Sequence, residues 1–209
     1  MTDRTPTEDG RAAVTPAVRH RTGPSGGTDG GLSPWRLLLF LGGGVFVLDV
    51  VTKWLVTNSM VLHQSIPVLG DVVRLTYIRN PGAAFGLHLG DYSRPFFIVV
   101  TFLALVFLGW MYAQTPSWDR IRLVSLVLLM SGAAGNLLDR LRWEAGVIDF
   151  VDVGLGDLRW PVFNVADSAI TIGAVLLAVS LWRHEAANDE DGRREAGETK
   201  GEGGSGGDG

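Results

Sequence analysis

Residues 37–57 read LLLFLGGGVFVLDVVTKWLVT, a run of 21 residues in which only Asp49 and Lys53 are charged. A helix needs about 20 apolar residues to cross a bilayer core of ~30 Å. This stretch therefore predicts a membrane-spanning helix. Three later runs have the same character, and the second of them needs Ile121 and Arg122 to reach full length. Together they predict a mainly α-helical membrane protein with four transmembrane helices, at residues 37–57, 95–113, 123–138 and 165–182.

The composition divides the chain into three parts. Residues 1–33 and 185–209 hold 14 of the 28 glycines and 19 of the 40 charged side chains, so they have too little apolar content to fold. The whole-chain averages of 46% hydrophobic and 19% charged hide this division. We predict disordered tails at 1–33 and 185–209 around a transmembrane domain at 34–184.

The distribution of lysine and arginine predicts the topology. Eleven of these residues lie in the tails and the short loop near Arg120, against six in the loops at 58–94 and 139–164. Positive charge concentrates on the cytoplasmic side, so both termini are predicted to be cytoplasmic and both long loops to lie outside. The loop stretches Val72–Ile78 and Val147–Val153 are rich in β-branched residues, which predicts short β-strands on the outer surface.

Several classes of function are excluded by what the sequence lacks. It has no basic stripe, which argues against nucleic-acid binding. It has no cysteine, so disulfides, thiolate zinc sites and a cysteine nucleophile are absent. No HExxH motif or other metal-ligand spacing occurs either, and we expect neither a metal nor an organic cofactor.

Carboxylates at the outer interface are the strongest functional feature. Of the ten acidic residues in 34–184, the predicted topology places only Asp119 on the cytoplasmic side. Two neighbouring carboxylates that share one proton can activate a water molecule for attack on a carbonyl group. Asp167, in the fourth apolar run, could form such a pair with Asp149 or Asp152. The spacing does not choose between these two partners.

Two acidic positions also have structural interpretations. Asp49 and Lys53 are four residues apart on one helix face, which is typical of an ion pair that lowers the cost of burial, although a proton or ion path is an alternative. Asn164 and Asp167 are three apart at a helix start, where a helix cap would explain both. Asp167 nevertheless lies inside the predicted membrane edge, where a cap alone gains little.

Two further polar groups flank these acids. Asn136 and Arg140 share a face at the outer end of the third predicted span, either as interfacial residues or as a fixed positive charge beside a catalytic group. Asn80, Pro81 and Gly82 indicate a turn, which could also serve as a binding loop.

These motifs together resemble the signal peptidase II family of bacterial membrane aspartyl peptidases, over about residues 36–183. The resemblance rests on five motifs that occur in order along the predicted spans. They are the Asp49 and Lys53 pair, NPGAAFG from Asn80, GNLLDR from Gly135, VIDF from Val147 and FNVADSAI from Phe163.

The resemblance assigns roles to individual residues. It implies that Asp149 and Asp167 are the catalytic pair, with Asn80, Gly82, Asn136, Arg140 and Asn164 around them and with Asp139, Asp49 and Lys53 in support. It further implies removal of the signal peptide from diacylglyceryl-modified prolipoproteins, just ahead of the lipidated cysteine. We expect a monomer in the bacterial inner membrane, in contact with lipids, with its active site at the outer face.

Two other functions compete with this interpretation. A small proton-coupled transporter could use Asp49, Lys53 and Asp167 as a relay, although the acids gather on one side and no inverted repeat is visible. A non-enzymatic membrane scaffold would leave the interfacial polar residues unexplained. Cleavage of a lipidated prolipoprotein in detergent, without an ion gradient, separates the three.

Overall fold

The computed structural model describes residues 33–82 and 90–202, with side chains described as far as residue 183. Residues 1–32 and 203–209 of the predicted tails lie outside the described residues. Within the described ranges, four helices are long and apolar enough to cross a membrane, which confirms the predicted fold class. They are Pro34–Ser59, Gly90–Gln114, Arg120–Arg142 and Val165–Arg183.

The first spanning segment is built from three consecutive helical pieces. These are α1 (Pro34–Leu37), the π-helical turn η1 (Leu38–Gly42) and α2 (Gly43–Ser59). Pro34 occupies the first turn, where its missing N–H has no helical partner to lose. The second segment is the short 3₁₀ turn η3 (Gly90–Tyr92) followed by α3 (Ser93–Gln114).

The third segment, α4 (Arg120–Arg142), lies at the centre of the helices. It packs against α2, α3 and the fourth helix, α5, which runs Val165–Glu202. In its most apolar window 44% of α4 is buried, against 6% for the Gly90–Gln114 segment. Helix α4 therefore encloses several polar residues, among them Asn136, Asp139 and Arg140, whereas most of the surface of α3 is exposed.

Helix α5 extends further than its apolar run. The sequence predicts a disordered tail from residue 185, but the backbone is helical through Glu202. Residues 185–202 contain several alanine, glutamate and arginine residues, which favour helical backbone even without a packed face. The side chains from residue 184 onward lie outside the described part of the chain.

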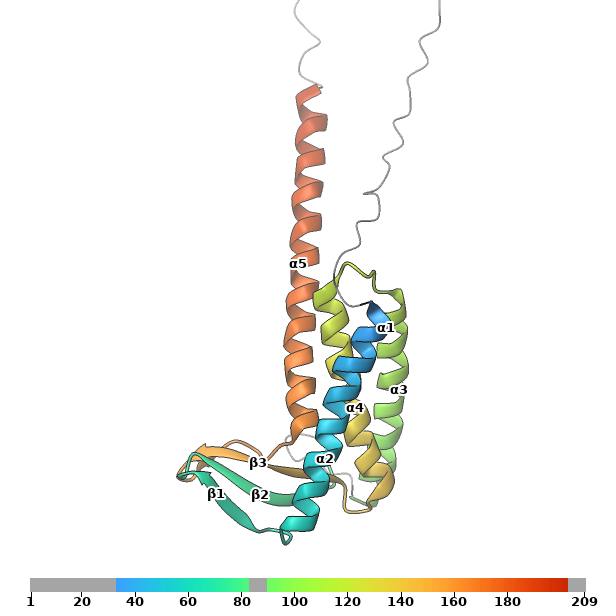
Figure 1. The fold of residues 1–209 in the computed structure, drawn as a ribbon. Helices are drawn as coiled ribbons and strands as arrows, with labels where there is room; N and C mark the ends of the chain where they lie inside the picture. The colour runs from blue at the N-terminus through green and yellow to red at the C-terminus, as the bar shows by residue number, and fades with distance from the viewer. Residues whose placement is uncertain (1–32, 83–89, 203–209) are drawn as a thin grey trace, which may run out of the picture. The chain divides into compact units, whose positions relative to one another are not determined.

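An antiparallel sheet lies at one end of the helices, where α2 and α4 end and α5 begins (Figure 1). Its strands among the described residues are β1 (Ser65–Leu69), β2 (Val73–Asn80), β3 (Val147–Leu155) and β4 (Leu158–Arg159), paired in that order. Strands β2 and β3 match the two predicted strands. Strand β1 was not predicted, because its sequence SIPVL contains a proline, which disfavours a strand. In the structure all five of its residues are exposed.

Two features fix the sheet to the helices. An apolar cluster of Val56, Tyr77, Ile148 and Phe150 packs the end of α2 against β2 and β3. Gly146, just before β3, has φ +91°, and a Cβ there would lie 2.1 Å from the carbonyl oxygen of Asn80. Only glycine permits this close approach, which brings Asn80 beside the strand that holds Asp149.

Helices α4 and α5 approach closely at glycine residues. A Cβ on Gly132 would lie 2.4 Å from the backbone oxygen of Ala166, and a Cβ on Gly173 would lie 2.8 Å from that of Ser125. Backbone atoms cannot rotate away from such a contact. The start of α5, with Asp167, is therefore held directly against α4.

We expect Gly132→Ala to lower both thermal stability and activity, because the added methyl group pushes the first turn of α5 away from α4. Overpacking of this kind costs about 1–3 kcal/mol. Gly109→Ala on α3 is the matched control, since a Cβ there meets nothing within 4 Å. The melting temperature in detergent checks this; equal values for the two variants would contradict the tight α4–α5 contact.

Candidate active site

The N-terminus of α5 is closed by Asn164 and Asp167. The Asp167 N–H donates to Asn164 Oδ1 at 2.8 Å, and the Asn164 N–H donates to Asp167 Oδ2 at 3.2 Å. This reciprocal pattern is a capping box, so the helix-cap interpretation is correct for these two residues. The cap uses one carboxylate oxygen of Asp167. Its other oxygen, Oδ1, accepts from Asn136 Nδ2 of α4 at 2.8 Å.

Asp149 lies on β3 and is only 1% exposed. Two asparagine amides hold its carboxyl group: Asn164 Nδ2 lies 2.7 Å from Oδ1, and Asn80 Nδ2 lies 3.0 Å from Oδ2. Both oxygens are thus fixed by donors that come from separate elements. Asp167 is half-buried, so one acid of the two is more open than the other.

The two carboxyl groups are joined through amides. Asn164 Nδ2, which binds Asp149, also lies 3.2 Å from Asn136 Oδ1, and Asn136 in turn binds Asp167. The sequence prediction that places Asp167 near a loop acid therefore agrees with the geometry. The structure brings Asp149, and not Asp152, into this network.

Burial raises the pKa of Asp149 from 3.8 to about 7, and the negative charge of Asp167 contributes to the rise. Hydrogen bonds from Asn80 and Asn164 oppose this rise but do not cancel it. Asp149 therefore retains a proton up to about neutral pH beside a second carboxyl group. Two such groups can divide the work of an acid and a base between them.

Asp152 occupies a different environment. It is three residues from Asp149 on a strand, so the two side chains point to opposite faces of the sheet. Its carboxylate accepts from Arg159 Nε at 2.6 Å and from Thr76 Oγ1 at 2.8 Å. Burial raises the pKa of Asp152, but these two hydrogen bonds and the positive charges of Arg159 and Arg74 together hold the pKa below its usual value. The group is an ionised partner of Arg159.

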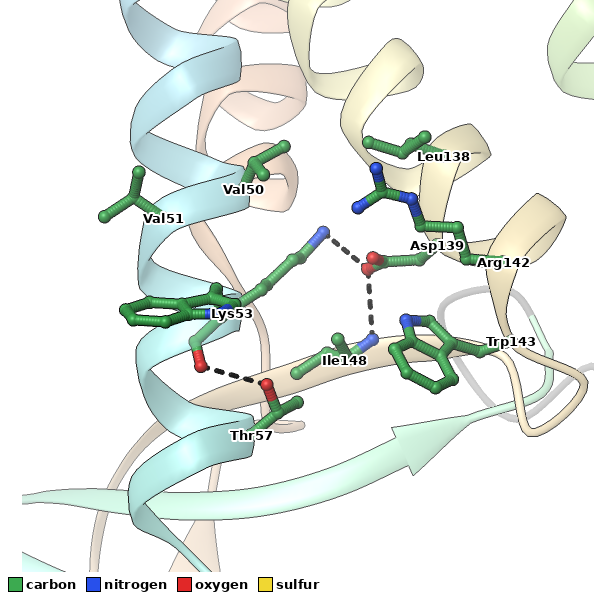
Figure 2. Close-up of a pocket in the computed structure, with 10 residues that line it drawn as sticks. Val50, Val51, Lys53, Thr57, Leu138, Asp139, Arg142, Trp143 and Ile148 are labelled. Carbon is green, nitrogen blue, oxygen red and sulfur yellow. Dashed lines mark hydrogen bonds and ion pairs between the residues drawn. The ribbon is translucent and has the colours of Figure 1, made fainter.

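Behind the carboxyl pair, Lys53 of α2 binds three side chains at once. Its Nζ lies 2.8 Å from Asp49 Oδ2, 2.9 Å from Asp139 Oδ2 and 3.0 Å from Asn136 Oδ1. The contact with Asp139 is visible in Figure 2. Asp49 and Lys53 thus form the predicted ion pair, and Asp139 extends it into a buried cluster.

Each carboxylate of this cluster also holds a backbone segment of the site. Asp49 Oδ1 accepts from the Ala166 N–H at 2.9 Å, one residue before Asp167. Asp139 Oδ2 accepts from the Ile148 N–H at 3.2 Å, one residue before Asp149 (Figure 2). The charged cluster therefore positions both segments that carry the carboxyl pair.

Arg140 holds the turn that follows β2. Its Nη2 donates to the Gly82 carbonyl at 3.0 Å and its Nη1 to the Asn136 carbonyl at 3.2 Å, while its guanidinium lies 5.4 Å from the centre of the Phe97 ring. The Gly82 N–H donates to Asn80 Oδ1 at 3.0 Å. The rest of the NPGAAFG motif, from Ala83, lies outside the described residues.

Sequence reasoning missed three contributors to this region. Thr76 and Arg159 hold Asp152 away from the pair, and Arg94 Nε donates to the Arg140 carbonyl at 2.8 Å near the end of α4. None of them lies in a recognisable motif. The available signal was the position of Asp152 on a predicted strand, because an acid there needs a basic partner, which is Arg159.

Four spanning helices in the described part of the chain, with a carboxyl pair formed by Asp149 of β3 and Asp167 of α5, are the features of a membrane enzyme. A family model described as signal peptidase (SPase) II matches residues 41–183. The lipoprotein signal peptidase of Syntrophotalea carbinolica is 41% identical over 73% of this chain and 94% of its own length. The chain therefore belongs to the signal peptidase II family, a family of proteases, as its motifs predicted.

Further relatives agree with this assignment. The lipoprotein signal peptidase of Geobacter metallireducens is 47% identical, covering 69% of this chain and 90% of its own. A solved bacterial membrane enzyme superposes with a TM-score of 0.65 at 30% identity, covering 72% of this chain and 90% of that one.

Proposed function

We propose that this protein cleaves the signal peptide from diacylglyceryl-modified prolipoproteins, immediately before the lipidated cysteine, with a water molecule activated between Asp149 and Asp167. The observation that supports it best is the pair itself. Asp149 and Asp167 come from β3 and α5, share the Asn164 and Asn136 amides, and interact strongly enough that Asp167 helps to raise the pKa of Asp149 to about 7.

In the proposed reaction the two acids exchange roles during one turnover. Ionised Asp167 takes a proton from water as the water oxygen bonds to the scissile carbonyl carbon, and protonated Asp149 gives its proton to the carbonyl oxygen. The tetrahedral intermediate then collapses. The carbon–nitrogen bond breaks, Asp167 gives its proton to the leaving amine, and Asp149 recovers its proton from the hydroxyl group of the intermediate.

The place of the pair suits a lipid-modified substrate. Both acids lie where the spanning helices meet the sheet, so a substrate whose signal helix lies in the bilayer would present its cleavage site at this level. Anchoring of both molecules in one membrane lowers the entropic cost of their encounter. Arg140 and the Asn80–Gly82 turn are proposed to bind the substrate backbone beside the pair.

A cleavage assay with purified protein tests the proposal directly. A synthetic prolipoprotein carrying a diacylglyceryl cysteine should give two products in detergent, and mass spectrometry should find the lipidated cysteine at the new N-terminus. The same peptide without the lipid should be cleaved far more slowly. Cleavage at another bond, or none, would contradict the proposed substrate.

The pH dependence of kcat/KM should report the raised pKa of Asp149. Because the pKa lies near 7, the acid form is present below neutral pH and is lost above it, so kcat/KM should fall about tenfold per pH unit above ~7. Asp152→Asn should keep this descending limb, since the pKa of Asp152 is lowered. A flat profile between pH 6 and 9 would mean that no shared proton limits the reaction.

The proposed topology places both termini in the cytoplasm and the sheet outside the inner membrane. The chain has no cysteine, so single cysteines can be introduced without background labelling. Thr28→Cys and Glu198→Cys should resist an impermeant thiol reagent in cells with an opened outer membrane. Asp157→Cys, exposed between β3 and β4, should react. The reverse pattern would place the carboxyl pair on the wrong side for this substrate.

A further inference from the structure

A groove opens between α2 and α4 near the sheet, on the outer surface of the spanning helices. Its cavity volume is about 190 Å³. Val50, Val51 and Leu138 form an apolar wall on the membrane side (Figure 2). None of these three residues belongs to the carboxyl pair or its amide partners. The groove is therefore a separate feature on the outside of the helices.

Two tryptophans border the sheet end of this groove. Trp54 is 61% exposed and Trp143 is 45% exposed, and both line the cavity. Indole rings concentrate at the level of lipid headgroups, because they combine an apolar face with a polar N–H. Their positions place the mouth of the groove at the membrane–water boundary.

Arg142 lines the groove with a positively charged side chain that has no acidic partner among the described residues. Its exposed side chain turns back along α4 toward Leu138 (Figure 2). Among the residues that the structure describes, it has no ion pair or hydrogen bond to its guanidinium. The other arginines at this end have polar partners: Arg74, Arg79, Arg94, Arg140 and Arg159.

The other charged side chains that line the groove, Lys53 and Asp139, already have partners within the protein. Lys53 lies at its inner wall but already contacts Asp49 and Asp139. Asp139 accepts from both Lys53 and the Ile148 N–H. Of the three charged residues that line the groove, Lys53, Asp139 and Arg142, it is Arg142 whose charged group has no partner among the described residues.

We propose that this groove binds a membrane phospholipid, with the lipid phosphate on Arg142 and an acyl chain along Val50, Val51 and Leu138. A guanidinium directed toward hydrocarbon is costly without an anionic partner. Phosphate is the partner it fits best, since its planar donors bind two phosphate oxygens at once. The indoles of Trp54 and Trp143 then lie beside the lipid headgroup.

The bound lipid would support the site from behind. Lys53 and Asp139 separate the groove from Asn136, which holds Asp167. An acyl chain in the groove would shield this charged cluster from water and headgroups. The inference concerns lipid binding alone and does not depend on the proposed cleavage reaction.

Native mass spectrometry of the delipidated full chain tests the proposal, with phosphatidylglycerol as the probe. Arg142→Gln should lower phosphatidylglycerol binding about tenfold, because it removes a charge-assisted contact. Val51→Phe keeps the charge but fills the groove, and should lower binding similarly. Arg74→Gln on β2 is the matched control, since Arg74 is paired with Asp71 of the turn before β2, and this variant should bind as the unaltered protein does.

Three outcomes would overturn the proposal. Equal binding by Arg142→Gln and Arg74→Gln would mean that Arg142 holds no phosphate. Equal binding of diacylglycerol and phosphatidylglycerol to the unaltered protein would make the groove a site for acyl chains only. Displacement of phosphatidylglycerol by similar concentrations of glycerol 3-phosphate would make it a site for soluble phosphate.

Discussion

Asp149→Asn and Asp167→Asn should each lower the cleavage rate about 10³-fold or more while the protein still folds and inserts. Asparagine keeps the shape of the side chain and removes the group that exchanges a proton. The single amide oxygen of an asparagine at position 149 can accept from Asn80 or from Asn164 but not from both, so we expect a modest loss of stability beside the loss of activity. Initial rates with a diacylated prolipoprotein measure the effect, and thermal melting in detergent checks the fold.

Asp152→Asn is the matched control for these variants. It lies on the same strand and is similarly buried, but it binds Arg159 and Thr76 on the opposite face. We expect it to retain most of the activity. The double variant of Asp149 and Asp167 should be hardly slower than either single one, because the two acids act as a unit. The mechanism is falsified if Asp149→Asn cleaves at a rate near that of the unaltered protein.

The spanning helices were predictable because hydrophobicity alone determines them. Each predicted run lies inside an observed spanning segment with ends within about five residues, although α5 continues beyond its span to Glu202. The π-helical turn Leu38–Gly42 was not predictable, since its residues are as apolar as their neighbours and only packing distinguishes it. Local composition therefore predicts the elements and leaves their internal irregularities to tertiary contacts.

The spacing of the acids left the choice between Asp149 and Asp152 open. The alternation of side chains along a strand shows that only one of the two can face α5, but not which one. If Val147–Leu155 is a strand, residues three apart must face opposite sides. Which side meets α5 depends on the pairing of β3 with β2 and on the contact between Asn164 and Asp149. These are long-range contacts that the spacing of one segment does not contain.

The cluster of Asp49, Lys53 and Asp139 also depends on long-range contacts that sequence spacing does not reveal. The Asp49 and Lys53 pair was visible as an i, i+4 spacing, but the contact of Asp49 with the Ala166 N–H joins residues 117 apart. Gly135 permits this arrangement, because a Cβ there would lie 2.4 Å from Asp49 Oδ2. The sequence predicted an ion pair, and only the structure reveals that the pair caps the helix carrying Asp167.

Lys53→Met should lower the free energy of unfolding by about 3–5 kcal/mol, because it leaves two buried carboxylates without their cation. Asp49 and Asp139 are 0% and 6% exposed, and Lys53 Nζ lies within 3 Å of both. Activity should fall as well, since Asn136 loses a donor and Asn136 holds Asp167. Melting followed by tryptophan fluorescence measures the first effect, and the cleavage rate of the remaining folded protein measures the second.

Two comparisons isolate burial as the cause of this loss. The Arg74 and Asp71 pair has nearly the same separation, 2.7 Å, but the side chain of Asp71 is 74% exposed, so Arg74→Gln should change stability by less than ~1 kcal/mol. Adding Asp49→Asn and Asp139→Asn to Lys53→Met removes the unpaired charges and should restore much of the lost stability. If the triple variant is no more stable than Lys53→Met alone, the lost packing of the lysine stem, and not the uncompensated charge, accounts for the effect.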